Sequence, residues 1–333
     1  MRAGLVLAFL AVCLLAAMLV GSVVGPYQIP PGEVLKALIA RLTGAPVTAP
    51  IDTILFQIRL PRVLAAALVG GALAAAGASY QTLFRNPLVS PDILGVSAGA
   101  GLGAVLGILL SLPVVAIQGL GFVTGLITVV IVYALARALR SQNEVLVLVL
   151  AGIVVGALAG AGISLVKILA DPYNQLPAIT FWLLGSLSGI KVSDVWSAAP
   201  LVVVGLLPLV LLRWRIGVLS LGDDEARALG VNVTLVRGIV IAAATLVTAA
   251  AVSVSGVIGW IGLMIPHMVR PLVGPRYDRV LPASVLMGAA FLVLVDTLAR
   301  SAARTEIPLG LLTALIGAPI FVWLLARGRR VWS

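Results

Sequence analysis

Long apolar runs without a charged side chain recur along the whole chain. The first extends from Leu5 to Val24 and contains no Asp, Glu, Lys or Arg. About twenty apolar residues in helical form cross the roughly 30 Å hydrocarbon core of a bilayer. A cleaved signal peptide is the competing interpretation. However, the run is long for such a segment, and no A-x-A site leads into a polar mature domain. We therefore expect a first membrane span that begins on the inner side.

The composition excludes a soluble protein. Hydrophobic residues make up 61% of the 333 residues and charged residues only 10%, whereas ordinary soluble domains are about 25% charged. The net charge of +10 fits basic residues in cytoplasmic loops better than a nucleic-acid partner. Backbone groups in lipid must be satisfied within their own segment, and these runs lack the alternation of barrel strands. The sequence thus predicts an all-α polytopic membrane protein, embedded in a lipid bilayer.

Ten segments have the composition of spans. Residues 25–55 are instead mixed and rich in proline, which predicts an extracytoplasmic loop with a short interfacial helix. The predicted spans are 5–24, 60–82, 93–110, 114–136, 145–168, 195–212, 238–254, 256–271, 281–299 and 309–326. This arrangement places fourteen of the 22 Lys and Arg residues inside and eight outside. Such a bias predicts that both termini are cytoplasmic.

Side chains suited to catalysis or ion coupling are scarce. The chain has no G-x-x-x-x-G-K-[ST] motif, so ATP and Mg²⁺ would be bound by another subunit and this chain is predicted not to be an enzyme. With one cysteine, Cys13, and one histidine, His267, no metal site and no catalytic residue is expected. Asp296 is the best intramembrane acid. Arg300 follows it by one helical turn, which favours a structural ion pair over a coupling role.

Residues 213–237 form the longest hydrophilic stretch after residue 60. Ser220 or Asp223 could cap a short helix there, three acids suit its first turn, and Gly230 could end it. A capped helix in a cytoplasmic loop could dock a soluble partner, but an ordinary solvated loop helix has the same composition.

Two further cytoplasmic segments carry unusual residues. The loop 81–92 contains Pro87 and Pro91, which predict a rigid turn. The sequence Pro266-His267 ends a span together with Arg270. We interpret His267 as a structural hydrogen-bonding residue rather than a ligand.

Several short motifs occur in order between residues 59 and 325. They are Arg59-Leu60-Pro61-Arg62, Gly70-Gly71-Ala72-Leu73, Gly77, Gln81, Asn86-Pro87-Leu88, Leu94-Gly95-Val96-Ser97-Ala98-Gly99-Ala100, Trp182-Leu183-Leu184-Gly185-Ser186, Leu221-Gly222 through Val231, Gly262-Leu263, Ile265-Pro266-His267 with Arg270, Pro308-Leu309-Gly310 and Gly317-Ala318-Pro319-Ile320-Phe321. Each motif is weak alone. The ordered series resembles the FecCD-type permeases, the membrane subunits of type II ABC importers for iron-siderophores, haem and cobalamin.

The resemblance implies a fold and a set of partners. It implies ten helices with an inverted repeat, spans 2–5 against spans 7–10, in the bacterial inner membrane. It implies a homodimer, two cytoplasmic ABC ATPase subunits and a periplasmic substrate-binding protein. Paired coupling helices would lie at 220–229 and 231–237, separated by Gly230. The coupling residues are then Leu221, Gly222, Asp223, Asp224, Glu225, Ala226, Arg227, Ala228, Leu229, Gly230 and Val231.

The resemblance also gives the outer arginines a role. Arg59, Arg62 and Arg300 match positions that pair with glutamates of the binding protein in the family. Without the resemblance, Arg59 and Arg62 are interpreted as interfacial anchors. Arg300 is contested, because it could serve Asp296 instead. The matching cytoplasmic structural residues are Gln81, Asn86, Pro87, Pro266, His267 and Arg270.

By the same resemblance, the translocation pathway would be lined by residues 145–168, 309–326 and a short helix within 172–190. The expected cargo is an iron chelate (ferric siderophore or haem) or cobalamin. Two other classes stay open: an ion-coupled transporter acting alone, and a channel or assembly factor without energy coupling. Co-purification of an ATPase separates the importer from both.

Overall fold

The computed structural model describes residues 2–139, 144–303 and 305–328. Arg140, Arg304, Arg329 and Arg330, which enter the charge count above, lie outside the described residues. The helices are α1 (Arg2–Val23), α2 (Pro31–Thr43), α3 (Ala49–Asp52), the π-helical η1 (Thr53–Arg59), α4 (Leu60–Leu83), the 3-10 turn η2 (Pro91–Leu94), α5 (Val96–Leu109), α6 (Val114–Ala138), α7 (Glu144–Leu169), α8 (Gln175–Leu183), α9 (Val192–Leu211), α10 (Arg213–Leu219), α11 (Asp223–Ala228), α12 (Val233–Ser255), α13 (Ile261–Val273), α14 (Tyr277–Ser301) and α15 (Leu309–Gly328).

Each of the ten predicted spans corresponds to an apolar helix. Among the described residues, seven helical segments are long and apolar enough to cross a membrane: α1, the run from α3 through α4, α6, α7, α9, α12 and α14. Three shorter apolar helices, α5, α13 and α15, take the remaining places. The all-helical membrane fold expected from the apolar runs is therefore confirmed.

The start of the second span differs from the prediction. The helix does not begin at residue 60, because α3, η1 and α4 follow one another without a break from Ala49. Pro50 stands in the first turn of α3, where a missing backbone N–H costs nothing. The amphipathic α2 is the short helix expected in the outer loop.

Two other boundaries also differ. The span predicted at 256–271 begins only at Ile261, because Gly256 (φ 68°) and Trp260 (φ 71°) adopt left-handed backbone conformations that interrupt a helix. The second coupling helix predicted at 231–237 does not exist as a separate element. Its residues from Val233 onward belong to α12, which continues to Ser255.

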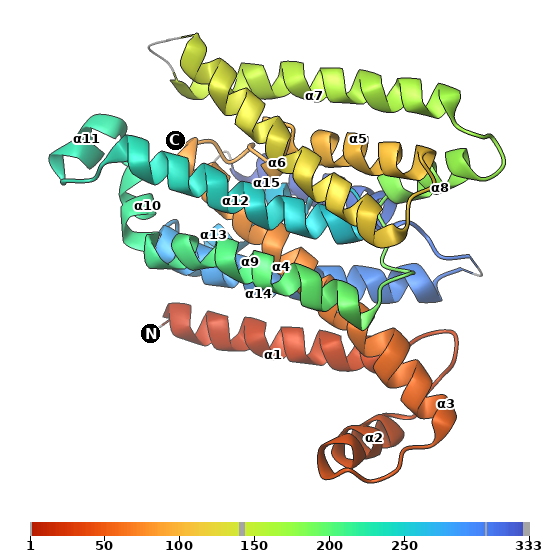
Figure 1. Ribbon diagram of the computed structural model, residues 1–333. Helices are drawn as coiled ribbons and strands as arrows, with labels where there is room; N and C mark the ends of the chain where they lie inside the picture. The colour runs from red at the N-terminus through yellow and green to blue at the C-terminus, as the bar shows by residue number, and fades with distance from the viewer. Residues whose placement is uncertain (1, 140–143, 304, 329–333) are drawn as a thin grey trace.

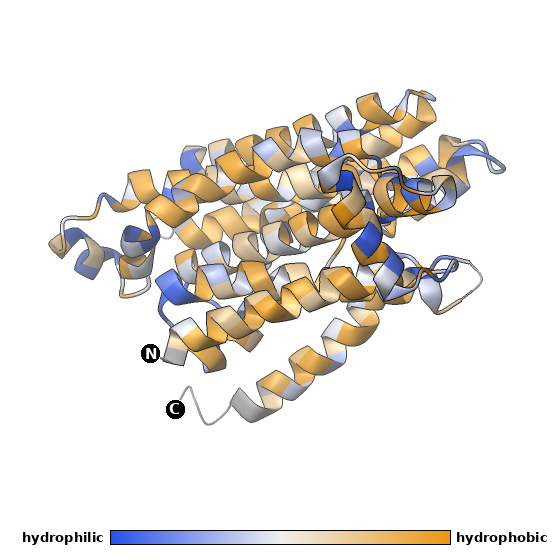
Figure 2. Ribbon diagram, turned by 90° about the horizontal axis from the view of Figure 1, so that it is seen from below, coloured by the Kyte–Doolittle hydropathy of each residue, from blue (hydrophilic) through white to orange (hydrophobic). Residues whose placement is uncertain are grey.

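The helices run roughly side by side (Figure 1), and α4, α12 and α14 each carry more buried residues than any other helix. Helices α1 and α7 lie on opposite sides of the bundle (Figure 1). The start of α1, the end of α15 and the short α11 lie at one end, while α3 and α8 lie at the other (Figures 1 and 2). Hydrophilic residues gather toward these two ends (Figure 2). We refer to the end with α11 as the inner end and to the opposite end as the outer end.

Glycines let α4 approach its neighbours closely. A Cβ atom at Gly70 would overlap the carbonyl oxygen of Gly288 in α14, and a Cβ atom at Gly77 would overlap that of Gly262 in α13. Such small-residue contacts are how membrane helices pack tightly. Gly99 and Gly103 likewise let α5 approach α6, because Cβ atoms at these positions would overlap Thr128 and Thr124 of α6. In α7, a Cβ atom at Gly152 would overlap the carbonyl oxygen of Ile93, whereas a Cβ atom at Gly160 would meet nothing within 4 Å.

This packing yields a matched pair of variants. Gly70→Val should destabilise the folded protein by about 3 kcal/mol or more, since overpacking against backbone cannot be relieved by a rotamer change. Gly160→Val should be tolerated, because the space around Gly160 is open. Thermal unfolding in detergent measures both. Equal melting temperatures for the two variants would contradict the close α4–α14 contact.

Candidate functional site

The inner end carries α11, whose ends are defined by two glycines. Gly222 precedes the helix with φ 140°, and no side chain caps the first turn. Gly230 follows it with φ 77°. The N–H of Gly230 donates to the carbonyl of Arg227 (2.9 Å), and the N–H of Val231 donates to that of Ala226 (2.9 Å). This pair of bonds is a Schellman motif, so Gly230 terminates the helix as predicted. The predicted cap by Ser220 or Asp223 is wrong.

Asp223 ties α11 to the membrane helices instead of capping it. Its carboxylate accepts a hydrogen bond from Nη2 of Arg237 in α12 (2.8 Å). Nη2 of Arg85, in the turn after α4, lies 3.8 Å from the same carboxylate. Arg237 is buried whereas Asp223 is partly exposed. Because three segments meet at one carboxylate, a displacement of α11 would act on both α12 and the end of α4.

The remaining predicted coupling residues divide into a buried and an exposed set. Ala226 is completely buried, and Val231 is also buried. Leu221 and Leu229 are exposed apolar side chains, and Asp224 pairs with Arg227 at the surface (2.8 Å). Helix α11 projects from the bundle (Figure 1), and the exposed side chains on and beside it are both apolar and charged. α10, which leads into it, was not expected from the sequence.

A second inner contact joins residues far apart in the chain. Nη1 of Arg270 donates to Oε1 of Gln81 (2.5 Å), and Nε2 of Gln81 donates to the carbonyl of Leu263 (3.0 Å). The end of α4 is thereby fixed to α13. Of the other residues of this predicted motif, Pro266 is buried in α13 and His267 contacts the ring of Phe321 in α15 (5.8 Å between centroids). Asn86, which precedes Pro87, accepts the N–H of Leu88 (2.9 Å) in a separate turn.

The Gln81–Arg270 contact gives a further prediction. Arg270→Met should lower the free energy of unfolding by about 1–3 kcal/mol, because the buried Gln81 loses its donor. Chemical unfolding in detergent, compared with the exposed Arg279→Met, measures the loss. Equal free energies of unfolding for Arg270→Met and Arg279→Met would show that this hydrogen bond does not stabilise the protein.

The outer end carries a buried ionic cluster centred on Arg62. Nε of Arg62 donates to both carboxylate oxygens of Asp296 (2.8 and 3.0 Å). Its Nη1 and Nη2 donate to the two oxygens of Glu306 (2.9 and 2.6 Å) in a fork. Nε of Arg300 lies 3.6 Å from Asp296. The expected Asp296–Arg300 contact therefore exists, but Arg62 is the closer partner of Asp296, which the sequence did not indicate.

The other two arginines predicted to dock the binding protein, Arg59 and Arg300, hold the end of α1. Nη1 of Arg59 donates to the carbonyls of Ser22 (2.9 Å) and Val23 (2.8 Å), and its Nη2 donates to that of Tyr27. Nη2 of Arg300 donates to the carbonyl of Gly21. The last carbonyls of a helix lack partners within the helix, and cations stabilise that end. All three guanidinium groups predicted to dock a partner are thus buried and engaged within the chain.

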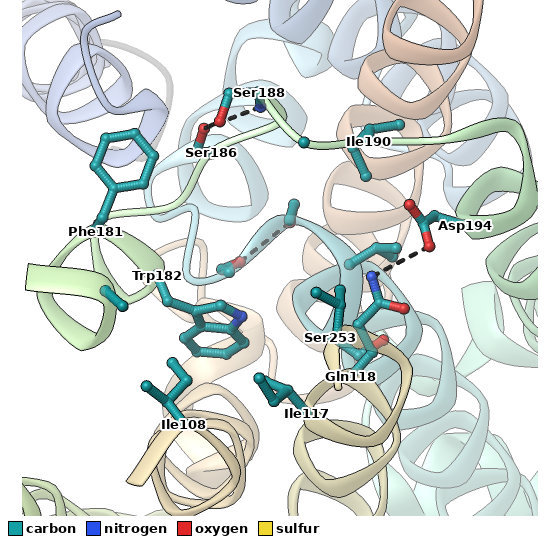
Figure 3. Close-up of a pocket in the computed structure, with 16 residues that line it drawn as sticks. Ile108, Ile117, Gln118, Phe181, Trp182, Ser186, Ser188, Ile190, Asp194 and Ser253 are labelled. Carbon is teal, nitrogen blue, oxygen red and sulfur yellow. Dashed lines mark hydrogen bonds between the residues drawn. The ribbon is translucent and has the colours of Figure 1, made fainter. Parts of the chain in front are cut away.

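A cavity of about 360 Å³, whose lining residues are drawn in Figure 3, has Ser186 in its wall, a residue that contacts the cluster. It lies between α8, the turn that follows α8, and the outer ends of α6 and α12. Trp182 and Phe181 form its apolar part, and Gln118, Asp194 and Ser186 its polar part (Figure 3). Oγ of Ser186 donates to Oε1 of Glu306 (3.3 Å), which connects the cavity wall to the ionic cluster.

An all-helical membrane protein whose inner end carries an exposed helix tied to two spans has the architecture of a transporter permease. The chain belongs to the FecCD transport family, which it matches over residues 10–327. It is 43% identical over 281 residues to the "Probable iron chelatin transport system permease protein" of Helicobacter pylori strain 26695, covering 84% of this chain and 85% of that one.

Two more similarities agree with this membership. The chain is 44% identical over 289 residues to the cobalamin import system permease protein of Halobacterium salinarum, covering 86% of this chain and 76% of that one. It also resembles a solved chain described as an inward-facing conformation of a metal-chelate type ABC transporter. That similarity has a TM-score of 0.86 and 35% identity, and covers 96% of this chain and 98% of the other. The family expected from the ordered motifs is therefore confirmed.

Proposed function

We propose that this chain is the permease subunit of an ATP-driven importer that moves an iron chelate, such as a ferric siderophore or haem, or cobalamin into the cytoplasm. Permeases of ABC transporters work with ATPase and binding-protein partners. The observation that carries the proposal is α11, an exposed helix that Asp223 ties to α12 and to the end of α4. The iron-chelate and cobalamin relatives support the substrate class.

The ATPase would bind the exposed face of α11, which points away from the bundle. Leu221 and Leu229 supply exposed apolar side chains, and Asp224 and Arg227 supply charges around them. ATP and Mg²⁺ belong to that partner. Movement of the ATPase would then reach the membrane helices through the carboxylate of Asp223 and its contacts with Arg237 and Arg85.

The permease would act as a homodimer in the bacterial inner membrane, with both termini on the α11 side. α7 and α15 carry exposed apolar side chains along their length, among them Leu158 and Leu315. Such faces suit both a second copy and a weakly binding translocation surface. Together with α8, these helices are the proposed pathway.

Docking of the binding protein would require an exchange of carboxylates. The bidentate face of Arg62 is occupied by Glu306, whose side chain is 21% exposed. A partner's glutamate can use the same fork only where Glu306 leaves it. Arg59 and Arg300 would then act as positioning residues that hold the end of α1 around the site.

Uptake into proteoliposomes tests the substrate class. Vesicles containing the chain, its co-purifying ATPase and internal ATP should accumulate a ferric siderophore, haem or cobalamin when the binding protein is added. Uptake driven by a proton or sodium gradient in the absence of ATP would contradict the proposal. Asp296, paired with two arginines, is poorly placed for such ion coupling.

A further inference from the structure

An apolar groove of about 410 Å³ lies on the side of the bundle between η1–α4 and the start of α9. Phe56, Leu60, Leu64 and Leu68 line one wall, and Val192 and Trp196 belong to the other. The spacing of four residues places each set on one face of its helix. All the residues that line the groove are apolar.

The groove opens away from the protein interior. Leu64 is 45% exposed, although every other residue of α4 is at least partly covered. Trp196 on the opposite wall is 73% exposed. Since α4 and α9 both span the membrane, the medium at this opening is lipid, and a central helix of the bundle reaches the bilayer here.

The length of the groove fits one leaflet. The twelve residue-to-residue steps from Phe56 to Leu68 correspond to roughly 18 Å at about 1.5 Å per step. Half of a hydrocarbon core of about 30 Å is roughly 15 Å. A partner helix would need a groove across the whole membrane, whereas a fatty-acyl chain needs one that ends near the midplane.

Cationic side chains lie at the outer end of the groove. The guanidinium of Arg41 lies 5.2 Å from the centroid of the Phe56 ring, and exposed Lys191 directly precedes Val192. Two acids are close: Asp52 lies 3.7 Å from Arg41, and Asp194 is buried and accepts the N–H of Lys191 (2.8 Å). The ammonium of Lys191 and the partly paired Arg41 suit an anionic headgroup.

We propose that this groove is a binding site for a phospholipid of the outer leaflet. One acyl chain lies between α4 and α9, and the phosphate lies at the end with Arg41 and Lys191. Arg62, the centre of the outer ionic cluster, lies on the same turn of α4 as Pro61 and Leu64, which line the groove. The bound lipid therefore covers α4 next to this cluster. The site is independent of the transported substrate.

Lipid retention by the purified protein tests the proposal. The wild-type chain is reconstituted in nanodiscs of phosphatidylglycerol and phosphatidylcholine, re-extracted in mild detergent and analysed by native mass spectrometry. Ala199→Trp fills the deep end of the groove. Val203→Trp, one turn further along α9 and exposed, is the matched control. We expect retained phosphatidylglycerol to fall about tenfold in Ala199→Trp, which corresponds to a tenfold loss of affinity, and to persist in Val203→Trp.

A second variant avoids the packed region. Arg41→Gln with Lys191→Gln should remove the preference for phosphatidylglycerol over phosphatidylcholine while the protein stays folded, as judged by circular dichroism. Equal lipid retention by all variants would overturn the proposal. Dissociation of a dimer in Ala199→Trp without a change in bound lipid would identify the groove as a surface between two copies, and would equally overturn it.

Discussion

Replacing Ala226 by glutamate should abolish ATP-driven uptake while leaving the membrane bundle intact. Ala226 is the completely buried residue of α11, and a buried carboxylate without a partner is strongly unfavourable. The side chain would therefore force α11 out of its position. We expect uptake into proteoliposomes to fall at least about tenfold, because a displacement costing only about 1.4 kcal/mol suffices for that factor.

The control introduces the same charge at an exposed position of the inner end. Leu139→Glu, just after α6, should retain most of the uptake. Both variants should insert into the membrane and elute as folded protein, because α11 contributes none of the spans. Wild-type uptake by Ala226→Glu would contradict the role of α11 in coupling.

Variants of Arg62 and Glu306 should act in opposite directions on the docking of the binding protein. Arg62→Met leaves Asp296 and Glu306 without their shared partner, and breaking a buried ion pair costs about 3–5 kcal/mol. Docking should be lost and the melting temperature should fall. Glu306→Gln keeps Arg62 but weakens the internal competitor, so the affinity for the binding protein should rise about tenfold, a change of about 1.4 kcal/mol.

Nanodiscs that contain the permease are immobilised on an optical biosensor. Titration with the binding protein then measures both affinities. The double variant Arg62→Met with Asp296→Asn should recover part of the lost stability, because the buried acid is then neutral, but none of the docking. A drop in affinity in Glu306→Gln that equals the drop in Arg62→Met would contradict the exchange of carboxylates. The cluster would then be purely structural.

The spans were predictable because they depend on local composition. Each apolar run had to become a helix in lipid, and the left-handed Gly230 had to end α11. The helical start at Ala49 escaped prediction, because Pro50 normally indicates a loop and only its place in the first turn makes it harmless. The continuous α12 escaped it as well, since nothing in residues 231–237 marks a single long helix.

The contacts of the candidate sites were less predictable, because they join distant residues. Arg62 and Asp296 are 234 positions apart, and Arg62 and Glu306 are 244 apart. Within the outer cluster, only the pair at one helical turn, Asp296 and Arg300, could be inferred from spacing. Glu306 stands outside any apolar run, where an acid ordinarily indicates a solvated loop. Asp223 resembled a helix cap by position, and its role as a tether depends on how Arg237 and Arg85 fold toward it.

Co-purification of partner subunits from the native membrane tests the role of α11 most directly. A tagged copy extracted in mild detergent should carry a P-loop ATPase at one copy per permease, with ATP hydrolysis in the eluate. Ala226→Glu should lose that subunit, and Leu139→Glu should keep it. Repeated recovery of the wild-type chain without any ATPase, under conditions that keep it folded, would contradict the claim that ATP drives transport through α11.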